Sequence, residues 1–277
     1  MANRSNLELR FRELGQGEPI VFLHGYGGSP ANWNQVTREL AKKFRVITPD
    51  LSEIYTDISK QFTFRQQVSA LSDFVSKIGD GKPVNIAASS YGGALAWGIA
   101  ITSPHLVEGL VLLSPMPPHP QSRIRNRVLK QFLFLGRWPK LLWLYLKSPL
   151  GRRALPRIAE IFQFSWALQN KMKSKRFSTL TIRQIQVLTH VIYRFSWILR
   201  LEDWSFWESR LQFIQSPICL IWGQRDMLFN QGEPERMQKI FEDCQLHSIA
   251  NTGHLSMRDN PAPVVQIIQN FLEKKAA

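Results

Sequence analysis

The chain has 277 residues, enough for one domain with a large insertion, and its 44% hydrophobic content allows a sizeable buried core and excludes wholesale disorder. Its two cysteines are too few for a disulfide framework, and Cys219, which lies in an apolar run, is predicted to be a small buried hydrophobe. No stretch reaches the length of a membrane span and no signal-peptide pattern opens the chain, so we expect a soluble, cytoplasmic protein.

The formal net charge of +14 is confined to one segment of the chain. Residues 116–215 contain 18 of the 35 lysines and arginines but only 4 of the 21 acidic residues, so they carry the whole excess. The same residues hold six of the nine tryptophans. This asymmetry indicates either a solvated helical face or a surface for a negatively charged partner.

Short β-rich apolar runs alternate with helical patterns along most of the chain, which is typical of a parallel sheet covered by helices. Between residues 114 and 216 this alternation stops, and long amphipathic helical patterns replace it. We therefore predict an α/β core formed by residues 1–115 and 216–277, and a helical cap formed by residues 116–215. The predicted strands are 7–14, 19–24, 44–48, 84–88, 109–113, 217–222 and 245–249, and the predicted core helices are 63–78, 91–101, 235–241 and 262–275.

A turn of small residues joins the strand at 84–88 to the helix at 91–101. A nucleophile elbow places its serine on a tight, strained turn of this kind, with small residues two positions before and two after the serine. Ala88 and Gly92 stand at those positions around Ser90, so Ser90 rather than Ser89 is the candidate nucleophile. Taken alone, the stretch is equally compatible with an ordinary turn.

Glycines also follow the strand at 19–24, in the sequence His-Gly-Tyr-Gly-Gly at residues 24–28. Glycine lets the backbone approach a ligand closely. The backbone N–H groups of Tyr26 and Tyr91 are therefore predicted to form an oxyanion hole. We expect His24 to be a hydrogen-bonding structural residue rather than a catalyst. The residues expected to support these loops are His24, Gly25, Gly27 and Gly92.

Two further polar residues follow predicted strands: Asp226 comes after 217–222, and His254 comes after 245–249. A serine hydroxyl is a poor nucleophile until a base accepts its proton, and an imidazole base needs a carboxylate to fix its tautomer. The chain order serine, aspartate, histidine, each in a loop after a strand, suits this division of roles. We predict Ser90 as nucleophile, His254 as base and Asp226 as orienting acid, with no metal or organic cofactor.

With these motifs the chain resembles the α/β-hydrolase superfamily over essentially its whole length outside residues 116–215. The resemblance implies an eight-stranded, mostly parallel sheet with a helical cap inserted after the sixth strand. It assigns the catalytic roles to Ser90, Asp226 and His254, and a serine nucleophile implies acyl-transfer hydrolysis. The residues after Asp50 depart from the Pro-Gly-x-Gly-x-Ser loop of many relatives, so no single relative supplies the substrate.

The predicted activity is hydrolysis of a carboxylic ester of a hydrophobic acyl group through an acyl-enzyme intermediate, as in a carboxylesterase or lipase. One alternative is an esterase for acyl groups on an acidic carrier protein, similar to the pimeloyl-carrier-protein methyl ester esterases. Another is a non-catalytic binding protein that kept the fold.

The basic cap has a bland interpretation, a solvated face around an apolar acyl pocket, and two functional ones. It would bind an anionic membrane surface, giving a peripherally attached cytoplasmic protein, or it would attract an acidic acyl carrier protein. Nucleic acid is the least favoured partner because no nucleic-acid motif accompanies the charge. The basic residues form two clusters: Arg123, Arg125, Arg127, Lys130, Arg137 and Lys140, and then Lys171, Lys173, Lys175 and Arg176.

Overall fold

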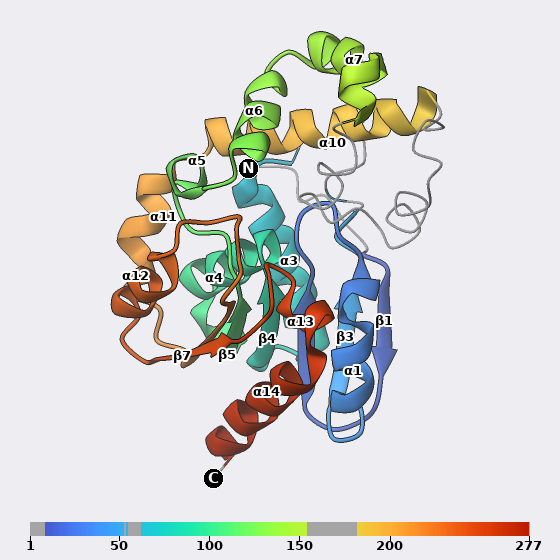
Figure 1. Ribbon diagram of the computed structural model, residues 1–277. Coiled ribbons are helices and arrows are strands. Elements are labelled where there is room, and N and C mark those ends of the chain that lie inside the picture. The colour runs from blue at the N-terminus through green and yellow to red at the C-terminus, as the bar shows by residue number, and fades with distance from the viewer. Residues whose placement is uncertain (1–8, 53, 55–61, 154–181, 277) are drawn as a thin grey trace, which may run out of the picture.

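The computed structural model describes residues 9–52, 54, 62–153 and 182–276, and its centre is one mostly parallel sheet (Figure 1). The strand order is β1-β3-β2-β4-β5-β6-β7, and only the edge strand β1 runs antiparallel to its neighbour. The strands are β1 (Phe11–Leu14), β2 (Pro19–Leu23), β3 (Arg45–Pro49), β4 (Val84–Ser89), β5 (Val107–Leu113), β6 (Ile218–Gly223) and β7 (Cys244–Ile249).

The predicted α/β class is confirmed, but the predicted count of eight strands is wrong for the described residues, which form a seven-stranded sheet. Each of the seven apolar runs identified in the sequence overlaps one strand, and the eighth strand was implied by the resemblance alone. The chain turns at Gly15 and Gly17, both at positive φ, and passes directly from β1 to β2. The long helical segment consequently follows the fifth strand rather than the sixth.

Helices cover both faces of the sheet because successive residues of each parallel strand point to opposite sides and both sides are buried. In β2, Ile20 and Phe22 pack in one hydrophobic cluster, whereas Val21 and Leu23 pack in the other. The first cluster lies under α1 (Asn34–Leu40) and α14 (Pro261–Ala276). The second lies under α3 (Phe64–Ile78) and α4 (Tyr91–Thr102). The helix α12 (Glu233–Ile240) contacts β6 and β7.

Local signals in the sequence explain several element boundaries. The Thr63 side chain accepts a hydrogen bond from the backbone N–H of Gln66, which begins α3, and Gly79 ends it. Cys219 is fully buried in β6, and burial raises the pKa of its thiol to about 12. The prediction that this cysteine is a packed hydrophobe is therefore confirmed.

The described residues between β5 and β6 form helices, and α6, α7 and α10 lie over the carboxyl ends of the strands (Figure 1). The longest of them, α10, extends across the top of the core, with α6 and α7 on its outer side. In the described residues, no helix combines the length and the apolar character that a membrane span needs. The second basic cluster, Lys171 to Arg176, lies outside the described residues. The helices are α5 (Pro120–Arg123), α6 (Arg127–Leu135), α7 (Pro139–Lys147), α10 (Ile182–Leu201) and α11 (Trp204–Leu211).

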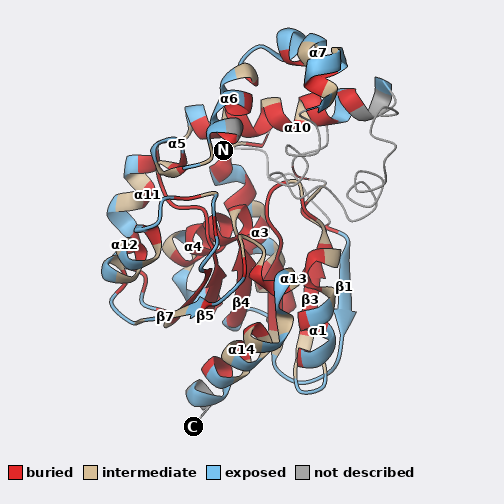
Figure 2. Ribbon diagram, in the orientation of Figure 1, coloured by how far each residue is buried: buried red, intermediate tan, exposed pale blue. Residues whose placement is uncertain are grey.

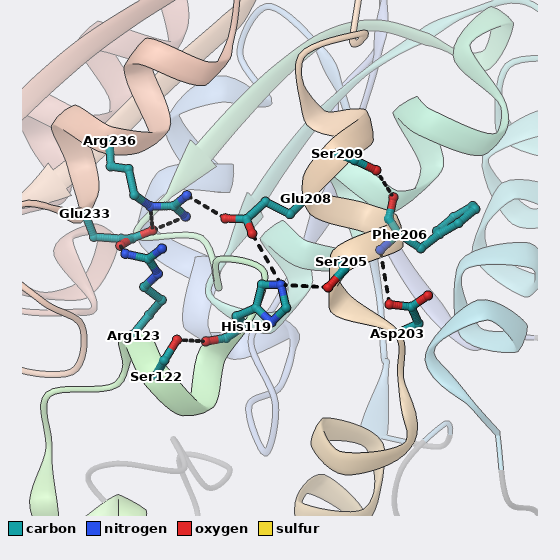
Figure 3. Close-up of polar contacts among 10 residues, drawn as sticks. All are labelled: His119, Ser122, Arg123, Asp203, Ser205, Phe206, Glu208, Ser209, Glu233 and Arg236. Carbon is teal, nitrogen blue, oxygen red and sulfur yellow. Dashed lines mark hydrogen bonds and ion pairs between the residues drawn. The ribbon is translucent and has the colours of Figure 1, made fainter.

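A charged network ties both ends of this helical segment to the core (Figure 3). Glu208 of α11 accepts a hydrogen bond from Arg236 of α12 at 2.8 Å, and its second oxygen lies 3.3 Å from the ring of His119. Arg236 also donates to the buried Glu233 at 2.8 Å, and Arg123 of α5 lies 3.9 Å from the same carboxylate. The entry and the exit of the segment are thus joined to α12 by opposite charges.

Candidate active site

Ser90 occupies the turn between β4 and α4 in a backbone conformation that few residues other than glycine adopt, with φ 52° and ψ −120°. Such a conformation costs on the order of 1–3 kcal/mol and persists only where the surroundings impose it. Two backbone hydrogen bonds do so: Ser90 N–H donates to Leu113 at 3.1 Å, and Met116 N–H donates to the Ser90 carbonyl at 2.7 Å. Ser90 stays half-buried, whereas Ser89 is fully buried inside β4.

Gly92 explains why the residue two positions after the serine must be small. A Cβ atom at this position would lie 2.6 Å from the carbonyl oxygens of both Leu23 and His24. The first turn of α4 therefore packs directly against the end of β2, and this contact brings the elbow beside the loop that follows β2.

The loop after β2 is held by His24, which is fully buried. Its Nδ1 atom lies 3.0 Å from the carbonyl oxygen of Gly25, and its Nε2 atom accepts a hydrogen bond from the backbone N–H of Leu51 at 3.0 Å. Both ring nitrogens are thus engaged in holding backbone. These contacts support the structural role predicted for His24.

Tyr26 and Tyr91, the two predicted oxyanion donors, lie next to each other, with ring centroids 5.3 Å apart in an edge-to-face arrangement. Tyr91 is the first residue of α4, so its N–H has no acceptor four residues earlier within the helix. The positive end of the helix dipole adds to the attraction for a negative oxygen at this point.

Asp226 and His254 meet above the ends of β6 and β7. One oxygen of the Asp226 carboxylate accepts a hydrogen bond from the backbone N–H of Leu228 at 2.8 Å, and the other lies 2.8 Å from Nδ1 of His254. The two loops approach closely because Gly223, at the end of β6, faces the backbone of Gly253, where a Cβ atom would lie 2.1 Å from a carbonyl oxygen.

The environment of Asp226 keeps its carboxylate ionised. Burial raises the pKa of Asp226, but the charge and hydrogen bond of His254 and the N–H of Leu228 outweigh burial and lower the pKa below its ordinary value. The hydroxyl of Ser114 acts in the same direction. An ionised carboxylate accepts the Nδ1 proton of the imidazole and leaves Nε2 as the nitrogen that can receive a proton.

The five predicted catalytic and oxyanion positions all follow the carboxyl ends of parallel strands at one edge of the sheet. The structure joins Asp226 to His254, but among the described contacts no hydrogen bond joins Ser90 to His254, and Nε2 is buried without a partner. Catalytic hydrogen bonds are often long in unliganded enzymes and tighten when substrate binds.

Four residues near the site escaped the sequence analysis. Ser114 follows β5, so the rule that found Asp226 and His254 also applies to it. The ring of Phe229 lies 5.5 Å from that of His254. Gln67 and Arg194 lie within helices, where hydrophobic periodicity does not reveal which polar side chains face a site.

Comparison with known proteins agrees with this geometry. A model of the alpha/beta hydrolase family matches residues 20–267. The chain is similar to the 2-hydroxy-6-oxo-6-(2'-aminophenyl)hexa-2,4-dienoic acid hydrolase of Metapseudomonas resinovorans, at 34% identity over 99% of this chain and 90% of the relative.

Two solved structures share the fold. A thermophilic esterase from Thermogutta terrifontis matches with a TM-score of 0.65 and 21% identity, covering 97% of this chain and 94% of the esterase. A hydrolase from Oleispira antarctica matches with a TM-score of 0.67 and 16% identity, covering 95% and 94%. The fold, the matching family model and the relatives agree, and the chain belongs to the α/β-hydrolase family.

Proposed function

We propose that this protein is a serine hydrolase that cleaves a carboxylic ester of a hydrophobic acyl group through an acyl-enzyme intermediate. The proposal rests above all on the 2.8 Å contact between Asp226 and His254, which leaves His254 Nε2 free at the sheet edge that also carries Ser90. The strained backbone of Ser90 supports it as well, because strain at a strand-to-helix turn is typical of an exposed nucleophile.

In the proposed cycle, Ser90 Oγ attacks the ester carbonyl carbon while His254 Nε2 takes the hydroxyl proton. The carbonyl electron pair moves to oxygen, and the backbone N–H groups of Tyr26 and Tyr91 hold the resulting oxyanion. The pair then re-forms the carbonyl and expels the alcohol, which takes the proton from His254. Water repeats the sequence on the acyl-enzyme, releasing the acid and restoring Ser90.

The walls around the site favour an apolar acyl group. The ring of Phe195 stacks on Tyr26 with centroids 4.4 Å apart and meets the edge of Tyr91 at 5.7 Å. The ring of Phe229 packs beside His254, with centroids 5.5 Å apart. Burial of a methylene group against such surfaces contributes about 0.8 kcal/mol.

A fluorophosphonate probe and a series of p-nitrophenyl esters of increasing acyl length test the proposal. The wild-type protein should be labelled and should hydrolyse the esters, and Ser90→Ala should do neither. Ser89→Ala is the matched control and should keep most of the activity, because Ser89 is buried within β4. Activity of Ser90→Ala at the wild-type rate would refute the assignment.

A second candidate is a hydrolase for ketone substrates rather than esters. The relative from Metapseudomonas resinovorans, at 34% identity, is named for a 6-oxo dienoic acid. Spectrophotometric assay with such a dienoic acid, in parallel with the ester series, separates the two. Turnover of the dienoic acid without turnover of any ester would favour this candidate.

We also propose that the outer cap face binds an anionic membrane surface. The outer cap face means here the exposed side chains of α6, of α7 and of the turn between them; both helices carry exposed segments (Figure 2). These side chains include four large apolar ones, Phe134, Trp138, Leu141 and Leu144, and four cations, Lys130, Arg137, Lys140 and Lys147. Apolar side chains that enter the lipid interface and cations that attract its headgroups are the combination an interfacial helix needs. Each cation near an anionic membrane contributes about 1 kcal/mol.

A further inference from the structure

Arg194 lies within α10 and its side chain is fully buried. Among the residues whose burial the structure describes, no other lysine or arginine is buried. Removing a guanidinium from water is unfavourable unless an opposite charge and hydrogen-bond acceptors replace the water. The same requirement holds for buried acids, and here it is satisfied: Arg236 lies beside Glu233, and His254 lies beside Asp226.

Within the described part of the chain, Arg194 has no ion pair and no hydrogen-bond acceptor to replace the water that burial removes. None of its three guanidinium nitrogen atoms has a hydrogen-bond partner there, and the guanidinium carbon lies 5.4 Å from the centroid of the Trp197 ring. A guanidinium presents five N–H donors in a planar fork that matches the two oxygens of a carboxylate. The fork of Arg194 is thus buried and unoccupied by any described residue.

The position of Arg194 connects it to the reaction centre. Val191, Arg194 and Phe195 share one face of α10, because residues three and four positions apart lie on the same side of a helix. Val191 and Phe195 both contact Tyr26, which lies in the loop after β2. Tyr26 donates its hydroxyl hydrogen to the Val191 carbonyl at 3.1 Å, and the Phe195 ring stacks on the Tyr26 ring. Arg194 therefore lies where the cap meets the loops that carry Tyr26 and Tyr91.

The positive charge of Arg194 acts on the pKa of both tyrosine hydroxyls, but neither hydroxyl neutralises it. Burial raises the pKa of Tyr26 and of Tyr91, and the nearby guanidinium opposes this rise in each case. The Tyr91 hydroxyl donates to Gln67 at 2.9 Å, so both hydroxyl hydrogens are directed to other acceptors. Tyrosines whose pKa lies above its ordinary value stay uncharged at neutral pH and supply no counter-ion.

We propose that Arg194 binds an anionic oxygen group, a carboxylate or phosphate, on the substrate that Ser90 attacks. This inference rests on the proposed function of the same site and narrows its substrate to esters that carry a negative charge. The substrate then supplies the counter-ion that the described residues do not provide. The charge lies on either the acyl side or the alcohol side of the ester, and two assay arms distinguish these sources.

The first arm compares mono-p-nitrophenyl adipate, which has a carboxylate on the acyl chain, with p-nitrophenyl hexanoate. The second compares 4-(butanoyloxy)benzoate, which has a carboxylate on the leaving group, with its methyl ester. In at least one arm, kcat/KM for the anionic ester should exceed that for the neutral ester. Arg194→Met should lower kcat/KM for that anionic ester by about 100-fold or more and leave the neutral ester within a few-fold of wild type.

Arg200→Met is the matched control, because Arg200 lies in the same helix but is exposed. This variant should leave kcat/KM unchanged for both the anionic and the neutral ester of each arm. Equal losses on charged and neutral esters in Arg194→Met would assign Arg194 a purely structural role and overturn the inference. Wild-type hydrolysis of neutral esters with no preference for either anionic ester would overturn it as well, and would leave the proposed function standing. Hydrolysis of no ester at all would refute the proposed function itself.

Thermal unfolding gives a second readout. A buried arginine kept for substrate binding destabilises the unliganded protein, so Arg194→Met should raise Tm or leave it unchanged. In the Ser90→Ala background, monomethyl adipate probes the acyl-side arm, and 4-hydroxybenzoate probes the alcohol-side arm. The probe of the preferred arm should raise Tm when Arg194 is present and should not do so in Ser90→Ala/Arg194→Met. A large fall in Tm on replacing Arg194 would mark it as a structural residue.

Discussion

The carboxylate of Asp226 lies 2.8 Å from Nδ1 of His254, although the two residues follow different strands. They meet because β6 and β7 are neighbours in register, with Gly223 opposite Ile249, so the loops after these strands begin side by side. Arg225 N–H donates to the Thr252 carbonyl at 2.8 Å and joins the two loops just before Asp226 and His254.

Asp226→Asn should lower kcat by about 10³–10⁴-fold, because an amide neither fixes the imidazole tautomer nor stabilises the imidazolium. The fold should persist, since asparagine has nearly the same shape. Steady-state ester hydrolysis measures the loss. Asp243→Asn, which neutralises an exposed aspartate in the loop before β7, should leave kcat unchanged. A wild-type kcat in Asp226→Asn would remove Asp226 from the mechanism.

The lowered pKa of Asp226 predicts the pH dependence of stability. Because the pKa in the folded state lies below the value of about 3.9 for an unfolded aspartate, the ionised carboxylate stabilises the fold above about pH 4. This contribution is lost as the pH falls through the folded-state pKa. Urea unfolding from pH 7 to pH 2 should therefore show the wild type losing more stability than Asp226→Asn, and parallel curves would contradict the assignment.

Gly92→Ala should damage both the elbow and the fold. The added methyl group would lie 2.6 Å from two carbonyl oxygens of β2 and its loop, so α4 must shift away. We expect the free energy of unfolding to fall by about 1–3 kcal/mol and ester hydrolysis to be largely lost. Gly232→Ala is the control, because nothing lies within 4 Å of the position its Cβ would take. Both quantities should be measured on the two variants together.

Glu233→Gln should destabilise the junction of the cap with the core. The carboxylate is buried, and its removal leaves the guanidinium of Arg236 without its closest counter-ion. Breaking a fully buried pair costs about 3–5 kcal/mol; here we expect about 1–3 kcal/mol, because Arg236 is half-buried and keeps its hydrogen bond to Glu208. Glu39→Gln, which breaks the exposed pair with Lys42, should cost less than about 0.5 kcal/mol in the same urea titration. Equal costs would mean that the network in Figure 3 adds little stability.

The outer cap face should lose its affinity for anionic vesicles when its apolar side chains are removed. Leu141→Ser/Leu144→Ser should sediment less with phosphatidylglycerol vesicles than wild type, and should hydrolyse a small neutral ester at the wild-type rate. Binding should also weaken between low and physiological salt, where the Debye length falls to about 8 Å. Phe213→Ser, which removes an apolar side chain that is also exposed but lies beyond α11, is the control.

The vesicle-binding measurement distinguishes an anionic membrane surface from an acidic acyl carrier protein as the partner of the cap. If Leu141→Ser/Leu144→Ser binds vesicles as wild type does, the outer cap face is not a membrane surface. Selective binding of an acidic acyl carrier protein instead would favour the carrier interpretation of the charge.

The strands could be predicted from the sequence because they depend on local rules, and so could the placing of Ser90, Asp226 and His254 in the loops that follow strands. Each residue lies in the loop that follows an apolar run, and parallel strands bring such loops to one edge of a sheet. The prediction of an eighth strand was wrong for the described residues, because it came from the resemblance and corresponded to none of the apolar runs identified in the sequence. Arg194 was not predicted because its position in the sequence is that of any cation on an amphipathic helix. Only the three-dimensional structure shows that Arg194 is buried, beside Trp197 and on the helix face whose Val191 and Phe195 contact Tyr26.

The cap leaves the sheet after β5 and returns to it at β6, and these two strands are direct neighbours. The backbone N–H of Ser114, just past β5, donates to the Ile221 carbonyl of β6 at 2.9 Å, and the hydroxyl of Ser216, just before β6, donates to the Val107 carbonyl of β5 at 2.8 Å. The strands β5 and β6 therefore stay paired beneath the insertion, whatever the length of the insertion. The inserted helices and the residues proposed to break the ester bond are thus encoded by separate stretches of the gene, so evolution can change the insertion while it conserves the core.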